Sequence, residues 1–138
     1  KAEWNKQIVA VKTMRTTKIN KPSLEHFKSE IVVMAPLHHP NLVNLLGACW
    51  TDGPDKLCIV LEFCEKGSVA DLLKRREHTW FNTYHGIALG IAKCFKYLHF
   101  DQPNQKALIH RDLKPANVLV ADDMTAKVAD CKSERSHA

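Results

Sequence analysis

The sequence predicts an α+β fold in which a small antiparallel sheet is followed by a helical region. Three observations support this class. Short apolar and β-branched stretches separated by turn residues fill the first half of the chain, a long stripe of apolar residues at helical spacing follows, and short β-like runs come last. The chain has no internal repeat and no low-complexity tract. We therefore expect a sheet-rich lobe joined to a helix-rich lobe.

The composition is that of a globular protein with a moderate positive charge. Of 138 residues, 45% are hydrophobic and 25% are charged, which disfavours a disordered tail, a collagen-like repeat and a coiled coil. The net charge of +5 comes from 20 Lys and Arg against 15 Asp and Glu. Because the basic residues are spread out and lack interleaved aromatics, a solvated basic face is favoured over a nucleic-acid-binding domain, which has only the net charge behind it.

Membrane insertion and disulfide bonding are both disfavoured by the sequence. The longest apolar run, 57–61, is too short to span a bilayer, and no signal peptide is visible. Five cysteines are an odd number without a CxxC pair, which favours free thiols in a reducing compartment over a zinc site. We expect a cytoplasmic protein with no membrane segment in this chain.

The first two predicted elements are a strand and a helix. Residues 7–12 (QIVAVK) predict a strand because β-branched residues alternate between two faces. Ser23 is predicted to cap a helix whose apolar positions recur at helical spacing as far as Met34. Pro36 marks where that helix has ended.

A hairpin and a short helix come next. Two apolar stretches, 42–50 and 56–62, are joined by turn-forming residues at 51–55, which predicts an antiparallel hairpin. Ser68 follows a break in the pattern and is predicted to cap a short helix that extends through Leu73.

A long helix dominates the second half of the prediction. It extends from Trp80 to Leu98, and its apolar stripe consists of Tyr84, Ile87, Ala88, Ile91, Ala92, Phe95 and Leu98. Three short β-like runs follow, at 107–109, 118–120 and 126–129.

Residues 110–117 read HRDLKPAN and carry the most specific motif. They lie in a predicted loop between two short strands, with Asp112, Lys114 and Asn117 close enough to converge on one point. This segment resembles the catalytic loop of protein kinases. His110 is predicted to be a hydrogen-bonded core residue rather than a catalyst.

Other segments strengthen the resemblance to protein kinases. The stretch VAVK, which ends at Lys12, resembles the strand lysine motif of the family, and Glu30 lies on the following helix, where the family places the partner of that lysine. Residues 39–50 resemble the fourth strand of the family and residues 57–62 the fifth.

The resemblance implies a truncated, protein-kinase-like two-lobed fold. Residues 1–61 would form part of the small antiparallel sheet lobe with its regulatory helix, residues 62–67 the hinge, and residues 68–138 the first part of the helical lobe. It also implies ATP as a substrate, Mg²⁺ as a cofactor and a protein as the phosphate acceptor.

The resemblance assigns the chemistry to four residues. Asp112 would accept the proton of the substrate hydroxyl, and Lys114 would neutralise the transferring phosphoryl group. Asn117 and Asp130 would hold magnesium. The motif LKPAN favours transfer to Ser or Thr over Tyr, and residues 39–50 resemble the tyrosine-kinase-like branch of Ser/Thr kinases.

The resemblance assigns nucleotide binding mainly to the sheet lobe and the hinge. Lys12 would bridge the α- and β-phosphates, and Glu30 would orient it by an ion pair. The remaining residues, expected around the adenine, are Ala10, Leu61, Glu62, Cys64 and Leu119. Leu61 would guard the back of the pocket and the hinge would contact the base through its backbone, whereas ordinary core packing is an equal alternative for Ala10 and Leu119.

The sequence departs from the family pattern at both ends. Residues 1–6 resemble the turn before the lysine strand, and no glycine-rich GxGxxG loop is present. Where the family has Asp-Phe-Gly, this chain has Asp130-Cys131-Lys132, and a lysine adopts the positive φ of a glycine only at a cost. We therefore expect part of a larger kinase domain. The competing hypothesis is a catalytically inactive, truncated kinase-like protein that at most binds a nucleotide or a partner.

Overall fold

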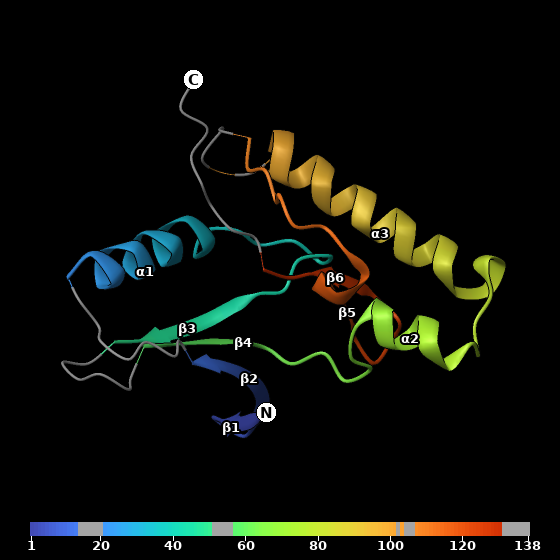
Figure 1. Cartoon of the computed structure of the whole chain (residues 1–138), viewed down its shortest axis with the longest axis horizontal. Helices are drawn as coiled ribbons and strands as arrows, with labels where there is room; N and C mark the ends of the chain where they lie inside the picture. Colours follow the sequence, from blue (N-terminus) through green and yellow to red (C-terminus); the bar gives the residue numbers. More distant parts are fainter. Residues whose placement is uncertain (14–20, 51–56, 102, 104–106, 131–138) are drawn as a thin grey trace. The chain divides into compact units, whose positions relative to one another are not determined.

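The computed structural model describes residues 1–13, 21–50, 57–101, 103 and 107–130 (Figure 1). The chain divides into two compact units. The first consists of Lys1–Pro36 with Asn44–Phe63, and the second of Leu37–Val43 with the residues from Cys64 onward. Strands and helices are both present, which confirms the predicted α+β class.

The two units do not coincide with the segments predicted from sequence, 1–61, 62–67 and 68–138. Residues 37–43 belong to the first of those segments but pack in the second unit, where Leu42 is 5% exposed. The three-segment division stays a prediction.

The first unit is a four-stranded antiparallel sheet and one helix. The strand order is β1-β2-β4-β3 (Figure 1). The strands are β1 (Ala2–Trp4), β2 (Gln7–Thr13), β3 (Leu45–Cys49) and β4 (Cys58–Glu62), and the helix is α1 (Lys21–Met34).

Strand β1 corrects the expectation of a turn over residues 1–6. Trp4 pairs with Gln7, so only Asn5 and Lys6 connect β1 to β2. Both have positive φ, 52° and 63°, the conformation of the two-residue turns whose twist matches that of antiparallel strands. Asparagine is one of the residues that tolerate this conformation best, and was the local signal for this hairpin.

The predicted strand over residues 7–12 is confirmed by β2, and the helix up to Met34 by α1. The expected position of the cap is wrong, because α1 begins at Lys21 and Ser23 therefore lies inside its first turn. Phe27 is the buried anchor of the helix, at 2% exposed.

The predicted hairpin is confirmed by β3 and β4, although with shorter strands. The two strands pair antiparallel, and a register shift between Leu45 and Gly47 bends β3. Leu42 lies outside this sheet and forms an isolated bridge with Val128. The expected turn at 51–55 lies outside the described residues.

The second unit begins with the short helix α2 (Val69–Arg75), as predicted. Ser68 caps it in a reciprocal arrangement, because its Oγ accepts a hydrogen bond from Asp71 N (3.2 Å) while Asp71 Oδ2 accepts one from Ser68 N (3.1 Å). Hydrogen bonds from Ser68 are also the main cause that lowers the pKa of the Asp71 carboxyl. Leu72 is buried, whereas Leu73 is 47% exposed.

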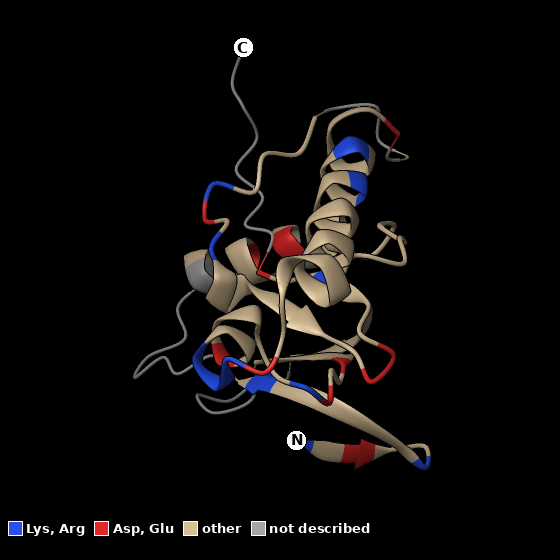
Figure 2. Cartoon of the chain, turned by 90° about the vertical axis from the view of Figure 1, so that its right-hand side faces the viewer, with Lys and Arg blue, Asp and Glu red and all other residues tan. Residues whose placement is uncertain are grey.

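The predicted long helix is α3 (His85–Lys96), extended by π-helical segments at Trp80–Tyr84 and Tyr97–Asp101. The last turn of α3 carries two basic residues, Lys93 and Lys96, and blue segments are visible on this helix in Figure 2. A positive charge at this end of a helix complements the helix dipole. The buried positions along this segment are Ile87, Gly90, Cys94 and Leu98. The expected stripe is therefore partly wrong, because Ala92 is exposed.

Gly90 explains how the buried face of α3 approaches its neighbours. A Cβ at this position would lie 2.7 Å from Asn41 Nδ2, which itself donates to Ala126 O (2.9 Å). Only glycine leaves room for that side chain.

The second unit ends in a two-stranded antiparallel sheet of β5 (Val118–Val120) and β6 (Ala126–Val128). These strands confirm two of the three β-like runs. The run at 107–109 is not a strand, although Leu108 N donates to Leu98 O (3.0 Å). Val128 and Leu98 are both fully buried in one apolar cluster, so β6 is anchored against the π-helical segment that follows α3.

Within the ranges that the structure describes, no helix is long and apolar enough to cross a membrane.

Candidate active site

The loop before β5 folds back on itself. Arg111 adopts a positive φ of 61°, which turns the chain sharply after His110. A short 3₁₀ turn at Pro115–Asn117 then closes the loop, with Asn117 N donating to Lys114 O (2.9 Å). Proline suits the start of such a turn, because its fixed φ is already helical and the missing N–H needs no acceptor.

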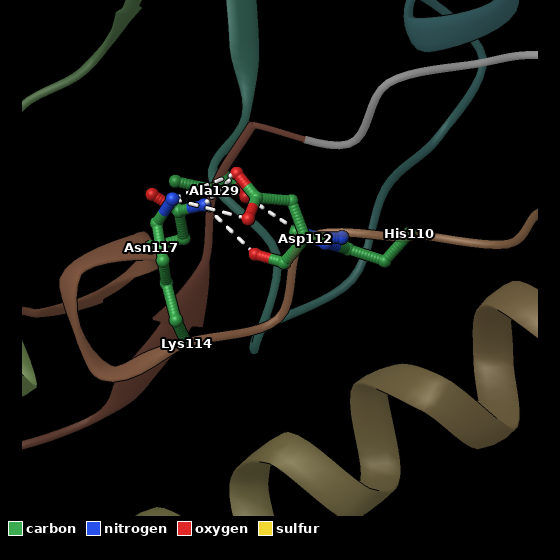
Figure 3. Close-up of polar contacts among 5 residues, drawn as sticks. All are labelled: His110, Asp112, Lys114, Asn117 and Ala129. Carbon is green, nitrogen blue, oxygen red and sulfur yellow. Dashed lines mark hydrogen bonds and ion pairs between the residues drawn. The ribbon is translucent and has the colours of Figure 1, made fainter.

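The carboxylate of Asp112 is the point on which this loop converges (Figure 3). Lys114 Nζ lies 3.0 Å from both Oδ1 and Oδ2 of Asp112. Asn117 Nδ2 donates to Asp112 Oδ2 (3.0 Å) and to the Asp112 backbone oxygen (2.8 Å). The structure thus brings together the three side chains that the sequence expected to converge. Asp112 and Lys114 remain reachable from solvent, with side chains 38% and 52% exposed.

His110 supports the loop from inside the protein. It is 1% exposed, and its Nε2 lies 2.6 Å from Ala129 O, while Nδ1 accepts from Asp112 N (3.3 Å). Because a carbonyl oxygen only accepts, these partners place the ring proton on Nε2. The prediction of a hydrogen-bonded core histidine is therefore confirmed, and His110 fixes the backbone of Asp112.

Asp130 follows the residue that links β6 to this loop. Ala129 N donates to Asn117 O (2.9 Å), while Ala129 O accepts from His110. Asp130 then adopts a positive φ of 56°, a conformation that aspartate tolerates better than most residues. The two expected magnesium ligands are therefore close in the fold, because Asp130 directly follows Ala129, whose N–H donates to Asn117 O.

The expected magnesium ligands are chemically suitable for that ion. Asn117 and Asp130 offer an amide oxygen and a carboxylate, both hard oxygen donors. Among the described residues there is no group of three or more His, Cys, Asp or Glu that could hold a metal ion. The one amide oxygen and one carboxylate of Asn117 and Asp130 fit Mg²⁺, because that ion binds through one or two carboxylates and completes its shell with phosphate and water oxygens.

Three predicted nucleotide residues of the first unit share one face of its sheet. Ala10 and Leu61 are directly paired across β2 and β4, and directly opposed residues point to the same side. Lys12 lies two positions along β2 from Ala10, so it points to that side as well.

Glu30 and Glu62 have recorded contacts within the first unit. Glu30 Oε1 lies 3.5 Å from His26 Nε2, one turn earlier on α1. Its ion pair with Lys12 stays a prediction. Glu62 Oε1 accepts from Asn44 N (2.8 Å), and Glu62 N donates to Asn44 O (3.1 Å). If the Glu62 backbone contacts an adenine, its carbonyl oxygen would therefore be the group that accepts a hydrogen bond from the base.

The remaining predicted residues belong to the second unit. Cys64 is buried, at 7% exposed. Leu119 is half-buried on β5 and forms an isolated bridge with Ser68. That the residues of the two units meet in one nucleotide site stays a prediction.

Comparison with known proteins decides the family. A family model described as protein tyrosine and serine/threonine kinase matches residues 1–137. The chain belongs to this protein kinase family.

Relatives of this kinase chain come from several kinds of organism. The serine/threonine-protein kinase STY17 of Arabidopsis thaliana is 38% identical over 125 residues, covering 90% of this chain and 21% of the relative. The cysteine-rich receptor-like protein kinase 14 of Arabidopsis thaliana is 40% identical, covering 88% and 18%. A putative serine/threonine-protein kinase/receptor, R818, of Acanthamoeba polyphaga mimivirus is 36% identical, covering 93% and 7%. The chain thus spans about a fifth or less of the length of these relatives.

Sequence reasoning missed the backbone of Ala129 as a part of the kinase loop. Its carbonyl oxygen holds His110 and its N–H holds Asn117, so one residue after β6 ties both ends of the loop (Figure 3). An alanine side chain gives no signal for this role. The clue in the sequence was the presence of two short β-like runs, 118–120 and 126–129, and in the structure the pairing of β5 with β6 brings residue 129 next to residue 117.

Proposed function

We propose that this chain is part of a kinase domain that transfers the γ-phosphate of ATP to a Ser or Thr hydroxyl of a protein substrate. The observation that carries the proposal is the Asp112 carboxylate held by Lys114 and Asn117 at hydrogen-bond distances near 3.0 Å. Membership of the kinase family supports the same chemistry. The names of the relatives support transfer to Ser or Thr.

Asp112 would act as the proton acceptor. The substrate hydroxyl oxygen forms a bond to the γ-phosphorus, the bond from that phosphorus to the β,γ-bridging oxygen breaks, and ADP leaves. The hydroxyl proton goes to Asp112, whose carboxylate is partly exposed and has a fixed orientation. The Lys114 ammonium, beside that carboxylate, would offset negative charge on the transferring group.

Asn117 and Asp130 would hold Mg²⁺. Asn117 Nδ2 donates to Asp112, so the amide oxygen of Asn117 is the atom suited to a cation. The ion, when bound, neutralises charge on the phosphate oxygens and orients them for in-line transfer.

The first unit would bind the nucleotide. Lys12 would contact the α- and β-phosphates and Glu30 would orient Lys12. Ala10 and Leu61 would contact the adenine on the face of the sheet that they share with Lys12, which supports the assignment. Glu62, Cys64 and Leu119 would complete the adenine site.

A cytoplasmic location is part of the proposal. The four cysteines that lie within the described residues are all free thiols, as is usual in a reducing compartment.

Phosphate transfer from γ-labelled ATP to a generic protein substrate tests the proposal. We expect Asp112→Asn to lower the rate by about 10²- to 10⁴-fold, the usual contribution of a general base. Asp122→Asn is the matched control, because Asp122 is 84% exposed and its recorded ion pair is with Lys66. Lys12→Met and the control Lys74→Met form a second pair, because Lys74 is 80% exposed on α2. Equal rates for Asp112→Asn and Asp122→Asn would refute the role of Asp112.

A second candidate is a kinase-like chain that binds nucleotide without transferring phosphate. It is favoured by Cys131-Lys132 in place of the Phe-Gly that follows the magnesium aspartate in the family. Thermal unfolding with and without Mg-ATP separates the candidates, because a ligand that prefers the folded state raises its stability. Stabilisation by Mg-ATP without phosphate transfer would select this second candidate. Phosphate transfer that Asp112→Asn abolishes would exclude it.

A further inference from the structure

Cys49 and Cys58 face each other across two neighbouring strands. Cys49 ends β3, Cys58 begins β4, and the two are direct partners in the antiparallel register. Such partners have Cα atoms roughly 4.5–5.5 Å apart. This interval lies inside the roughly 4.4–6.8 Å over which a disulfide forms without backbone movement.

The two thiols lie on the same face of the sheet, and that of Cys49 is open to solvent. Cys49 is exposed and Cys58 is half-buried. The pKa of Cys58 is raised mainly by burial, and then by the charge and the side-chain hydrogen bond of Cys49. This influence of Cys49 on the pKa of Cys58 agrees with the register, which places the two side chains next to one another on one face of the sheet. Cys49 is the thiol that an external reagent reaches first.

Two other described cysteines are shielded from such reagents. Cys64 is 7% exposed and Cys94 is fully buried. Burial raises the pKa of Cys94 to about 12, which keeps it in the unreactive thiol form at neutral pH. Accessibility thus singles out the pair in the sheet.

We infer that Cys49 and Cys58 form a reversible cross-strand disulfide by exchange with a low-molecular-weight disulfide such as oxidised glutathione. The Cys49 thiolate attacks one glutathione sulfur, which forms a mixed disulfide and releases one glutathione. Cys58 then attacks the Cys49 sulfur and releases the second glutathione. Two protein thiols are oxidised to one disulfide, and their two protons and two electrons leave on the two glutathiones.

The bond would fasten the edge strand of the sheet to its neighbour. Among the described strands, β3 is at the end of the strand order and pairs only with β4, which also carries Leu61. Oxidation would close the loop from Cys49 to Cys58 and restrict the unfolded chain there. The inference rests on the first unit alone and does not depend on the proposed function.

Redox titration of the native full chain tests the inference. The chain is equilibrated in glutathione buffers, quenched with acid, alkylated and digested with trypsin. Cleavage at Lys56 separates the two cysteines into peptides 29–56 and 57–66. We expect these peptides to be linked, with a mass two hydrogen atoms below their sum, and fragment ions to assign the bond to Cys58 rather than Cys64. Cys94 is expected to carry the alkyl group.

Chain unfolded in guanidinium chloride is the reference for the titration. The measured quantity is the concentration of oxidised glutathione divided by the square of that of reduced glutathione, taken where half of the pair is oxidised. We expect this ratio to be at least about tenfold lower for the native chain than for the unfolded chain, because the register holds the two thiols together. In the Cys58→Ser variant we expect the reaction with oxidised glutathione to stop at the mixed disulfide on Cys49. Equal midpoints in the native and unfolded chains would overturn the inference. So would a disulfide-linked dimer, or a mixed disulfide on Cys49, as the final product of the native chain.

Discussion

The loop that carries Asp112 and the strand and helix that carry Lys12 and Glu30 are assembled in different ways. Lys114 and Asn117 reach Asp112 from within a few residues of it, through one reversed φ and one 3₁₀ turn. Lys12 and Glu30 come from β2 and α1, and the recorded partner of Glu30 is His26 on its own helix.

The contacts of Asp112 are local in the sequence, whereas a contact between Lys12 and Glu30 would join two separate elements. Contacts inside one loop need only the correct local backbone, so they form wherever the loop is anchored. An ion pair between a strand and a helix depends on how the two elements pack, whereas a Glu on a helix finds a partner one turn away at little cost. The predictions below ask how strongly each arrangement depends on its surroundings.

The largest effect is expected from the apolar anchor of the loop. Leu98 is fully buried beside Val128, and the residue after Val128 holds His110. Leu98→Ala should lower the free energy of unfolding by about 2–5 kcal/mol, because it leaves a cavity. Urea denaturation measures this.

The matched control for Leu98 is on α3. Leu89→Ala removes the same atoms from a side chain that is 48% exposed, so its cost should be under about 1 kcal/mol. Similar losses for both variants would show that the loop does not depend on this cluster.

A smaller loss is expected at His110. His110→Ala leaves Ala129 O and Asp112 N without their buried partner, which should cost about 1–3 kcal/mol for the lost hydrogen bonds. Faster amide hydrogen exchange at Asp112 would be the local signature. The control is His85→Ala, an exposed histidine at the start of α3; if it destabilises the chain as much, the loop is not held through His110.

The cap of α2 is expected to contribute about 1 kcal/mol. Ser68→Ala removes the acceptor for Asp71 N and should destabilise the protein by that amount at neutral pH. Thermal or urea unfolding measures the difference between variant and parent.

The contribution of the Asp71 carboxylate to this cap should depend on pH in a defined direction. The pKa of Asp71 is lowered in the folded state from the ordinary 3.8, first by hydrogen bonds from Ser68. Stability from this group is therefore present above about pH 3.8 and is lost as the pH falls through the lower folded-state pKa. If the stability gap between Ser68→Ala and the parent stayed constant from pH 6 to acid denaturation, the carboxylate would have no part in the cap.

The smallest effect is expected at the helix pair of the first unit. His26→Gln should change the free energy of unfolding by about 0.2–0.5 kcal/mol, because the His26 side chain is 64% exposed and solvent screens its interaction with Glu30. It should leave stabilisation by Mg-ATP unchanged, whereas Glu30→Gln should reduce it. Equal stabilisation by Mg-ATP of the Glu30→Gln variant and the parent would remove Glu30 from the nucleotide site.

Most elements could be predicted because their signals are local. Ser68, with Asp71 three residues later, is a complete capping signal, and the alternation in residues 7–12 defines β2. The strand expected at 107–109 failed because Leu108 donates its N–H to Leu98 O, just beyond α3, and packs against the cluster of Leu98 and Val128, while Ile109 is 45% exposed. The face of α3 was misjudged at Ala92 because Gly90 and Cys94, which are small, occupy its closest approach.

The sequence by itself determined the kinase family, the α+β class and the three residues of the loop that lie near one another, because each of these depends on contiguous patterns. The tertiary structure alone decided that the backbone of Ala129 ties His110 to Asn117. It also decided that Cys49 and Cys58 are direct partners across two strands, and that the backbone N–H of Glu62 donates to Asn44 O. These contacts depend on backbone hydrogen bonds and on strand register, which join residues far apart in the chain. The pattern of side chains along the sequence does not specify them.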